Sequence, residues 1–505
     1  MNFIGMRWKS SKHKVKIFKL INNVGFMKHV SLFFKLFLLA ARHPLTSFRQ
    51  LNFKNIRNLK KVLAKRNEDD VYELVAAGIG VLGHPLGEKA SLMERDYPGI
   101  TEPVAIGKAF SLEKKLRTPP YEILANAKKR VNFLLPHLDP NIIFGGYISC
   151  LELIRKLVDR GHSVRILLCD TSSYDRIGLL KKFNSNPKIR NALELCEIQN
   201  ISGGKESLVI SPHDSFIAYS AWTGLTAYKL ASAIHKKFIF FLQEHESIFH
   251  PYESERAIID SVYDLPHYAM FNTSILRDYF REKQLGVYSP NQLDCGEETS
   301  LFFQHALTKT SPPTLEQLST RKTKRLLFYG RPESHARRNL FEIAFLGLRK
   351  AVSSGVFGSE WEFIGVGTLA REYSLPLGDG KVLRLMGKLP LNDYAEALKT
   401  FDLGLSLMYA PHPSILPFEM ASSGIVTVTN TFDGRDEKIL TNISSNLLPC
   451  SPTIDGVANA LIDAVYNHVH RNEERISGSS LDWVMDWDLA FNDEVIKKVE
   501  QFIDG

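Results

Sequence analysis

The sequence predicts an α/β protein with two domains, each built on a parallel sheet. Short continuous apolar runs alternate with longer amphipathic stretches, which is the pattern of strand–helix–strand units. This alternation occupies residues 130–305, stops over a polar stretch at 306–324 and starts again over 325–485. A chain of 505 residues is long enough to form more than one complete hydrophobic core.

Charge is distributed unevenly along the chain. Residues 1–67 contain 16 Lys and Arg and no Asp or Glu, so this arm carries +16, whereas the remainder has 47 basic and 55 acidic residues and a net charge of −8. The cysteines are scattered without a CxxC pair, which favours buried thiols in the cytoplasm over disulfides or a zinc site. They are Cys150, Cys169, Cys196, Cys295 and Cys450.

The arm contains an apolar run, Val30–Ala41, interrupted only by Ser31 and Lys35. It is too short to cross a bilayer, which needs roughly 20 residues. Flanking basic residues favour a helix lying on the anionic inner face of the cell membrane, and packing against the body of the protein is the main alternative. A signal peptide is disfavoured because the charged region before the run is too long. Nucleic acid is not an expected partner, because no recognised binding module is present.

Residues 68–129 read as a mixed helical connector without a legible function. The first sheet domain begins with a predicted strand at 131–136, followed by Gly145-Gly146, a helix ending at Arg160 and a strand at 164–170. A glycine pair between strand and helix allows close approach of a diphosphate to the backbone. A plain tight turn remains the alternative.

A second candidate lies at the end of the predicted strand 237–242, which runs directly into Gln243-Glu244-His245-Glu246. Ligands of parallel sheets bind beyond the carboxyl ends of the strands, so we expect this polar cluster at a binding site. A solvated loop is the alternative. The adjacent spacing does not suit a metal site. The next strand, 268–272, should end in a helix cap at Asn272-Thr-Ser.

The second domain opens with a strand that ends at Gly330-Arg331-Pro332, and Arg337-Arg338-Asn339 is predicted to open a helix reaching Val352. Two guanidinium groups beside a helix N-terminus suit a diphosphate. Surface salt bridges are the alternative, above all for Arg337. Strands at 361–367 and 382–386 and a helix at 393–400 follow.

The most informative stretch is 408–431. A strand at 402–407 leads into a Pro/His/Ser loop, and then into a short helix that carries Glu419 in its first turn and stops at Gly424. Helix N-terminal amides attract an anion, and a carboxylate can accept hydrogen bonds from two neighbouring hydroxyls. The pattern therefore predicts a site for a phosphate and a sugar, with an ordinary solvated helix as the alternative.

These segments resemble the retaining GT-B glycosyltransferases of family four, and most of all bacterial rhamnosyltransferases of surface polysaccharide (rhamnan) synthesis. The resemblance covers about residues 130–490 and is carried by Phe-Gly-Gly at 144–146, Phe-Leu-Gln-Glu-His-Glu at 241–246, Tyr-Gly-Arg-Pro at 329–332 and Pro-His-Pro-Ser-Ile-Leu-Pro-Phe-Glu at 411–419. It implies two Rossmann-like domains across a cleft, with the donor nucleotide sugar on the C-terminal domain and the acceptor on the N-terminal one.

The resemblance also implies residue roles. Glu419 would bind the ribose, Arg331 and Arg338 the diphosphate, and the amides around Ser414 and Ile415 its oxygens. The remaining expected contacts are Gly387 and Lys388 with the base, Gly145 and Gly146 with the diphosphate, and His245 with the transferred sugar; the catalytic candidates are His245, Glu244, Glu246 and Arg331.

One position departs from the wider family. Where it has a second glutamate, eight residues before the ribose-binding one, this chain has Pro411, and His412 is a partial replacement. No protein nucleophile is evident, so the resemblance implies front-face attack with retention of configuration and without a metal or other cofactor. Asp486-Trp487-Asp488 matches a DxD metal motif but is interpreted as packing and capping within a tail, 486–505, that returns to the N-terminal domain.

The predicted function is transfer of rhamnose from dTDP-rhamnose to a lipid-linked glycan by a peripheral protein of the inner membrane face. The alternative is a non-catalytic nucleotide- or sugar-binding subunit of a polysaccharide-assembly complex. A nucleotide-sugar epimerase is disfavoured, because the Tyr-x-x-x-Lys pair and a GxxGxxG opening are missing.

Overall fold

The computed structural model describes residue 109 and residues 111–505, except 141, 142, 144, 171–173, 203–206, 368–371 and 388–390. The chain divides into two compact units, Met1–Lys114 and Lys115–Gly505. The predicted arm at 1–67 and most of the predicted connector at 68–129 therefore lie outside the described residues. Within the described residues, no helix has the length and apolar character needed to cross a membrane.

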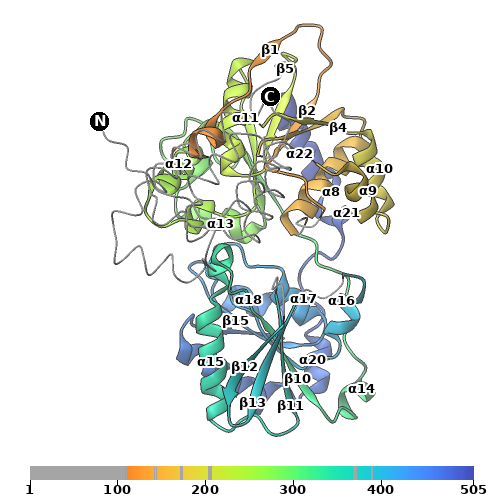
Figure 1. The fold of residues 1–505 in the computed structure, drawn as a ribbon, viewed down its shortest axis with the longest axis vertical. Coiled ribbons are helices and arrows are strands. Elements are labelled where there is room, and N and C mark those ends of the chain that lie inside the picture. The colour runs from red at the N-terminus through yellow and green to blue at the C-terminus, as the bar shows by residue number, and fades with distance from the viewer. Residues whose placement is uncertain are drawn as a thin grey trace, which may run out of the picture. The chain divides into compact units, whose positions relative to one another are not determined.

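The N-terminal domain runs from orange to green in Figure 1. It is built on a parallel sheet of seven strands in the order β4-β3-β2-β6-β7-β8-β9. The strands are β2 (Val131–Leu135), β3 (Val164–Leu168), β4 (Glu197–Asn200), β6 (Ser215–Ala218), β7 (Phe238–Leu242), β8 (His267–Asn272) and β9 (Ser300–Phe303). Strand β2 pairs with β3 on one side and β6 on the other, with Val131 opposite both Val164 and Ser215. The order of the strands reverses between β2 and β6, the position where such sheets bind ligands.

Helices cover both faces of this sheet. Phe133 points into a core shared with α8 (Gly145–Asp159), whereas the next residue, Leu134, points into a core shared with α11 (Ala221–Ala233). Successive residues are buried on opposite faces of the sheet, so most residues of such a strand are apolar and the strand reads as a continuous apolar run. The other helices are α9 (Arg176–Lys182), α10 (Pro187–Leu195), α12 (Ser254–Tyr263) and α13 (Ser274–Glu282), with short 3-10 turns η2 (Glu246–Phe249) and η3 (Gly286–Tyr288).

The C-terminal domain repeats the plan with the strand order β12-β13-β11-β10-β14-β15-β16. Its strands are β10 (Lys324–Tyr329), β11 (Trp361–Val366), β12 (Tyr373–Gly378), β13 (Lys381–Met386), β14 (Leu403–Leu405), β15 (Val426–Asn430) and β16 (Leu447–Cys450). All pair in parallel except β12, which is antiparallel to β13. The order reverses between β10 and β14, where the second predicted site lies. The predicted α/β architecture with two parallel-sheet domains is confirmed.

The helices of this domain are α14 (Leu315–Ser319), α15 (Phe341–Ser353), α16 (Leu391–Leu398), α17 (Leu416–Ser422), α18 (Glu437–Ile443), α19 (Ile454–Asp463) and α20 (Asn472–Ser477), with a π-turn, η5 (Ala464–His468), after α19. The predicted helix from Arg337 to Val352 is wrong at its start. Arg337 and Arg338 lie in a 3-10 turn, η4 (Ser334–Asn339), and Leu340 has a left-handed backbone (φ 50°) that separates this turn from α15.

Two further features depart from the sequence reading. The described part of the connector includes a strand, β1 (Tyr121–Ile123), that pairs in parallel with β5 (Leu208–Ile210) in a separate small sheet. The predicted helix cap after β8 is made by Thr273, whose hydroxyl accepts from the Leu276 amide, while Asn272 serves the site described below. All five cysteines are free, four of them at least partly buried.

The C-terminal tail contains α21 (Trp487–Ala490) and α22 (Asp493–Asp504), which pack on the N-terminal domain. Asp486 caps α21 by accepting from the Asp488 amide at 2.8 Å. The Asp488 carboxylate contacts Arg155, Lys156 and Lys188, with distances of 2.7 to 3.2 Å. The DxD motif is thus used for capping and ion pairs.

Candidate functional site

The loop at the N-terminal switch point is closely packed around Gly146. A Cβ atom at this position would lie 2.7 Å from Tyr219 Oη and 3.0 Å from Gln243 Oε1, so only glycine fits without displacement. Tyr219 directly follows β6 and Gln243 directly follows β7. The predicted Gly145-Gly146 pair therefore begins α8 beside the ends of two neighbouring strands.

A buried polar network continues from Gln243. Its Oε1 accepts from Asn272 Nδ2 at 2.8 Å, and Asn272 Nδ2 also lies 3.1 Å from His305 Nδ1. Burial lowers the pKa of His305 to about 3, so this ring is neutral. Among the described residues, Gln243 Nε2 and Asn272 Oδ1 have no hydrogen-bond partner although both are buried. The network therefore retains one donor and one acceptor for a further polar group.

Glu244 connects loops of the two domains. Its Oε1 accepts from the amide of His245 at 3.0 Å and from the amide of His412 at 3.2 Å. Burial raises the pKa of Glu244 to about 7, against the lowering effects of these two amides and of Arg338 and Arg435. A carboxyl group with a pKa near neutrality can exchange a proton at physiological pH.

The two neighbours of Glu244 are held differently. The His245 ring is enclosed by Tyr263, Tyr279 and Phe280, with ring centroids 5.4 to 5.7 Å away, and burial lowers its pKa to about 4. Glu246 Oε2 accepts from the amide of Ala221 at 3.0 Å, which caps the N-terminus of α11, and burial raises the pKa of Glu246 to about 8. These contacts favour a positioning role for Glu246.

Both predicted diphosphate arginines lie beyond the end of β10. Arg331 contacts Glu333 Oε2 at 3.1 Å and Tyr329 Oη at 3.3 Å. The guanidinium of Arg338 lies 4.7 Å from the ring centre of Phe249. Burial lowers the pKa of Arg338, the Glu244 carboxylate raises it and Arg331 lowers it. The charged groups of Glu244, Arg331 and Arg338 therefore lie close enough to interact electrostatically.

Glu419 is buried in the first turn of α17, as the sequence predicts. Its Oε1 accepts from the Thr308 amide at 2.9 Å, and its Oε2 accepts from Tyr394 Oη at 2.8 Å. Burial raises the pKa of Glu419, and the bonds from Thr308 and Tyr394 oppose this effect. Because each carboxylate oxygen can accept two hydrogen bonds, the group has capacity left for hydroxyls.

Arg435 holds the loop before α17 in place through hydrogen bonds to backbone carbonyls. Its guanidinium donates to the carbonyls of Met408 at 2.6 Å, Asn430 at 3.2 Å and His412 at 3.2 Å. The Ser414 amide donates to His412 Nδ1 at 3.1 Å, and Ser414 has a left-handed backbone with φ 63°. This bond places the ring proton of His412 on Nε2, which has no partner among the described residues. Burial lowers the pKa of His412 to about 3.

The structure therefore brings five of the predicted residues together in one group. Glu244, Arg331, Arg338 and His412 interact directly or electrostatically, and Glu419 joins them through Tyr394 and Tyr329. Gly387 follows β13 at the same end of the C-terminal sheet, Ile415 precedes α17, and Lys388 lies outside the described residues. The Ser414 amide is occupied by His412 Nδ1, so it is not available as an anion donor in this conformation.

Sequence reasoning missed Arg435 and Tyr394. Tyr394 bonds Glu419 over 25 positions, Arg435 bonds His412 and Met408 over 23 and 27 positions, and neither belongs to a recognisable motif. A buried arginine needs acceptors around it, but the sequence does not show which carbonyls supply them.

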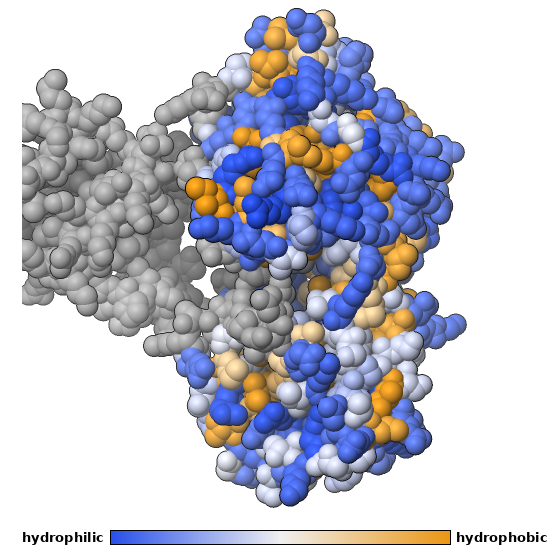
Figure 2. Space-filling model, turned by 90° about the vertical axis from the view of Figure 1, so that its right-hand side faces the viewer, coloured by the Kyte–Doolittle hydropathy of each residue, from blue (hydrophilic) through white to orange (hydrophobic). Residues whose placement is uncertain are grey.

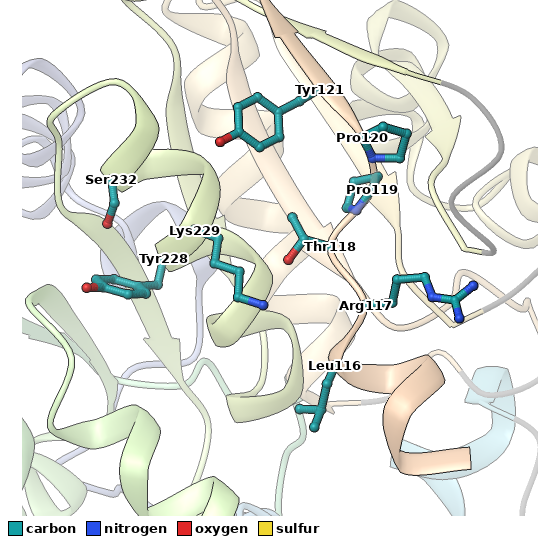
Figure 3. Close-up of a pocket in the computed structure, with 9 residues that line it drawn as sticks. All are labelled: Leu116, Arg117, Thr118, Pro119, Pro120, Tyr121, Tyr228, Lys229 and Ser232. Carbon is teal, nitrogen blue, oxygen red and sulfur yellow. The ribbon is translucent and has the colours of Figure 1, made fainter. Parts of the chain in front are cut away.

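Other candidate sites are less well formed. A pocket of about 710 Å³ lies between residues 116–121 and α11 (Figure 3), and no predicted site residue lines it. His250, Glu253 and Glu255 could hold a metal ion, since their ligand atoms lie within 4.8 Å of one another; Glu253 is exposed, and His250 Nδ1 lies 2.9 Å from the partly buried Glu255 carboxylate. On the face in Figure 2, the described surface is mostly hydrophilic with small separate apolar groups.

Two family models match the chain in this order: WsaF, N-terminal domain, over residues 130–274, and WsaF, C-terminal domain, over residues 324–462. Both WsaF domains are present in this chain. The glycine pair and the Gln243–Glu246 loop belong to the WsaF N-terminal domain, and the two arginines and Glu419 belong to the WsaF C-terminal domain.

A curated relative, the O-antigen biosynthesis protein RfbC of Myxococcus xanthus, is 28% identical over 256 residues, which are 48% of this chain and 18% of that protein. The chain thus spans less than a fifth of this relative's length. Among solved structures, Alr3699/HepE of Anabaena in complex with UDP matches with a TM-score of 0.51 and 12% identity, over 74% of this chain and 100% of the other. WaaG, a glycosyltransferase involved in lipopolysaccharide biosynthesis, matches with a TM-score of 0.46 and 13% identity, over 74% and 100% of the two chains.

The WsaF domains of this chain together form the GT-B fold, with two Rossmann-like domains in succession. The likeness to Alr3699/HepE concerns the fold only, since so few residues are identical.

Proposed function

We propose that the protein is a glycosyltransferase that moves a sugar from a nucleoside diphosphate donor to a saccharide acceptor in surface polysaccharide biosynthesis. The observation that carries the proposal is the arrangement of Arg331, Arg338 and Glu419 at the switch point of the C-terminal sheet, next to the bond between Glu244 and the His412 amide. The names of RfbC and WaaG, which refer to O-antigen and lipopolysaccharide biosynthesis, agree with this class of product.

The charges of the site suit departure of a diphosphate. Two guanidinium groups would neutralise the oxygens that gain charge as the bond between the anomeric carbon and the diphosphate breaks, and no metal is required for this role. The acceptor hydroxyl would form the new bond to the anomeric carbon from the same face, and its proton would pass to the departing diphosphate. The configuration would then be retained without a covalent enzyme intermediate.

Glu419 would recognise the donor through its ribose hydroxyls. Tyr394 and the Thr308 amide already hold the carboxylate in one orientation, so little conformational freedom would be lost when the donor binds. For contact with the base we propose Gly387 and Lys388, for the sugar rhamnose from dTDP-rhamnose, and for the acceptor a lipid-linked glycan. The complex of Alr3699/HepE with UDP agrees with a nucleotide donor at a GT-B site.

The first test is a donor screen with dTDP-rhamnose, UDP-glucose and a GDP-sugar, followed by transfer assays on variants. Glu419→Ala and Arg331→Ala should each lower kcat/KM by about 10²–10³. Glu342→Ala and Arg349→Ala, exposed positions on α15, serve as matched controls that keep activity. Unchanged transfer in both site variants would refute the proposal, and donor binding without turnover in the wild type would favour a non-catalytic subunit.

A further inference from the structure

Four aromatic rings form a row that crosses from the C-terminal to the N-terminal domain. Tyr409 packs edge-on against Phe432 with ring centres 4.9 Å apart, Phe432 lies 6.5 Å from Tyr279, and Tyr279 lies 5.7 Å from His245. Tyr409 is 51% exposed, Phe432 and Tyr279 are partly buried, and His245 is buried. The row therefore leads from solvent to a predicted catalytic residue.

Exposure of Tyr409 is not a sign of a loose loop, because hydrogen bonds hold both its own amide and the residue before it. The Tyr409 amide donates to the Arg338 carbonyl at 2.7 Å. The preceding residue, Met408, donates to Asn430 Oδ1 at 2.7 Å and accepts from Arg435 at 2.6 Å. A rigid, half-exposed tyrosine offers a large apolar contact at low conformational cost, which is typical of binding surfaces.

An ion pair between the domains flanks the row. Lys283, directly after α13, contacts Asp433 at 2.9 Å, and both side chains keep about a third of their surface exposed. Asp433 follows Phe432 in the chain and has a left-handed backbone with φ 47°. The pair thus adds partly exposed charged donors and acceptors at the edge of the aromatic surface.

We propose that Tyr409, Phe432 and Tyr279, with the Lys283–Asp433 pair, bind the saccharide chain of the acceptor. This inference rests on the proposed function and names the surface that the acceptor uses. A pyranose ring has one face of C–H bonds, which are attracted to the negative face of an aromatic ring, and a rim of hydroxyls that need hydrogen-bond partners. Aromatic rings beside a few polar groups supply both, and the row ends at His245, next to Glu244.

The test measures saccharide binding separately from nucleotide binding on the full-length protein. The probe is a rhamnose trisaccharide, observed by saturation-transfer NMR with dTDP present, while dTDP affinity is measured by calorimetry. Tyr409→Ala should weaken trisaccharide binding at least about fivefold and leave dTDP affinity within about twofold, whereas Tyr409→Trp should retain both. Tyr466→Ala is the matched control, because Tyr466 is 63% exposed but lies in η5 and takes part in none of the ring contacts that form the row.

Equal trisaccharide binding by the wild type and Tyr409→Ala would overturn the proposal. So would absence of trisaccharide binding to a wild type that binds dTDP, an outcome that leaves the donor half of the proposed function intact. If phospholipid vesicles without saccharide protect Tyr409 from iodination and the trisaccharide does not, the row is a lipid surface and the proposal fails. If the wild type does not bind dTDP, the result would count against the proposed function itself.

Discussion

The carboxyl group of Glu244 lies where loops of the two domains meet, and its burial has a consequence for stability. The pKa of Glu244 rises from its ordinary value of 4.5 to about 7. Between these pH values the unfolded chain has released a proton that the folded protein still holds, so raising the pH favours unfolding. The stabilising contribution is complete below pH 4.5 and is lost as the pH approaches 7. Glu246, with a pKa of about 8, acts in the same direction.

Glu244→Gln should therefore stabilise the protein at pH 8 while leaving it unchanged at pH 4.5. The gain is roughly 3 kcal/mol at most, from a shift of this size. The amide oxygen can still accept from the His245 and His412 amides, so the loops should stay in place. The measurement is the melting temperature from pH 5 to pH 8, where the wild type should lose more stability than the variant.

The exposed substitution Glu473→Gln is the control and should leave the pH dependence of the wild type unchanged. Transfer activity on the same samples separates stability from function. If the carboxyl group exchanges a proton during the reaction, kcat should fall at least tenfold while the melting temperature at pH 8 rises. Parallel pH profiles for wild type and Glu244→Gln would show that the carboxyl is ionised in both states and would refute this account.

At the scale of elements, helix α22 completes the core of the domain that begins more than 350 residues earlier in the chain. Ile496, Val499, Phe502 and Ile503 are buried in the same cluster as β2 and α8. Phe502 stacks on Tyr268 with ring centres 4.3 Å apart and planes 6° apart. The tail is therefore part of the N-terminal domain in energetic terms, although it follows the C-terminal domain in sequence.

Phe502→Ala should lower the free energy of unfolding by about 3–5 kcal/mol, because it leaves a cavity and removes the ring contact. Urea unfolding followed by far-ultraviolet circular dichroism measures this loss. Lys497→Ala, on the exposed face of the same helix, should change it by less than about 0.5 kcal/mol. Similar unfolding midpoints for all three proteins would mean that α22 is dispensable for the domain.

The elements also show which parts of the fold are legible in the sequence. Strands such as β2, β7 and β10 are predicted to within two residues, because a strand buried on both faces is a continuous apolar run. The edge strand β12 was not predicted, since three of its six residues, Tyr373, Ser374 and Pro376, are exposed and leave no continuous apolar run. The start of α15 was misplaced because the left-handed Leu340 has no sequence signature.

Less of the candidate site than of the fold can be predicted from the sequence. Parallel-sheet topology predicts that residues after the strands gather at one end, and Glu244 after β7 and Arg331 after β10 lie in such positions. Their partners are not predictable in this way, since Thr308 reaches Glu419 over 111 positions and His412 reaches Glu244 over 168. Whether an amide such as that of Ser414 is available to a ligand depends on these partners and requires coordinates.

At the scale of the whole molecule, charge separates the chain into an arm of +16 and a remainder of −8. We propose that the arm binds the anionic inner membrane face, where a lipid-linked acceptor would be presented.

Replacement of Lys12, Lys14, Lys16 and Lys19 by Gln should weaken binding to vesicles with 30% phosphatidylglycerol at least about tenfold, since each basic residue near such a surface contributes about 1 kcal/mol. Exposed Lys181, Lys182, Lys322 and Lys497 replaced by Gln form a charge-matched control with little expected effect. Vesicle sedimentation of the full-length protein should show binding that falls as salt rises, because screening shortens the range of the attraction. Equal binding to neutral and anionic vesicles, or equal losses in the two quadruple variants, would exclude an electrostatic role for the arm.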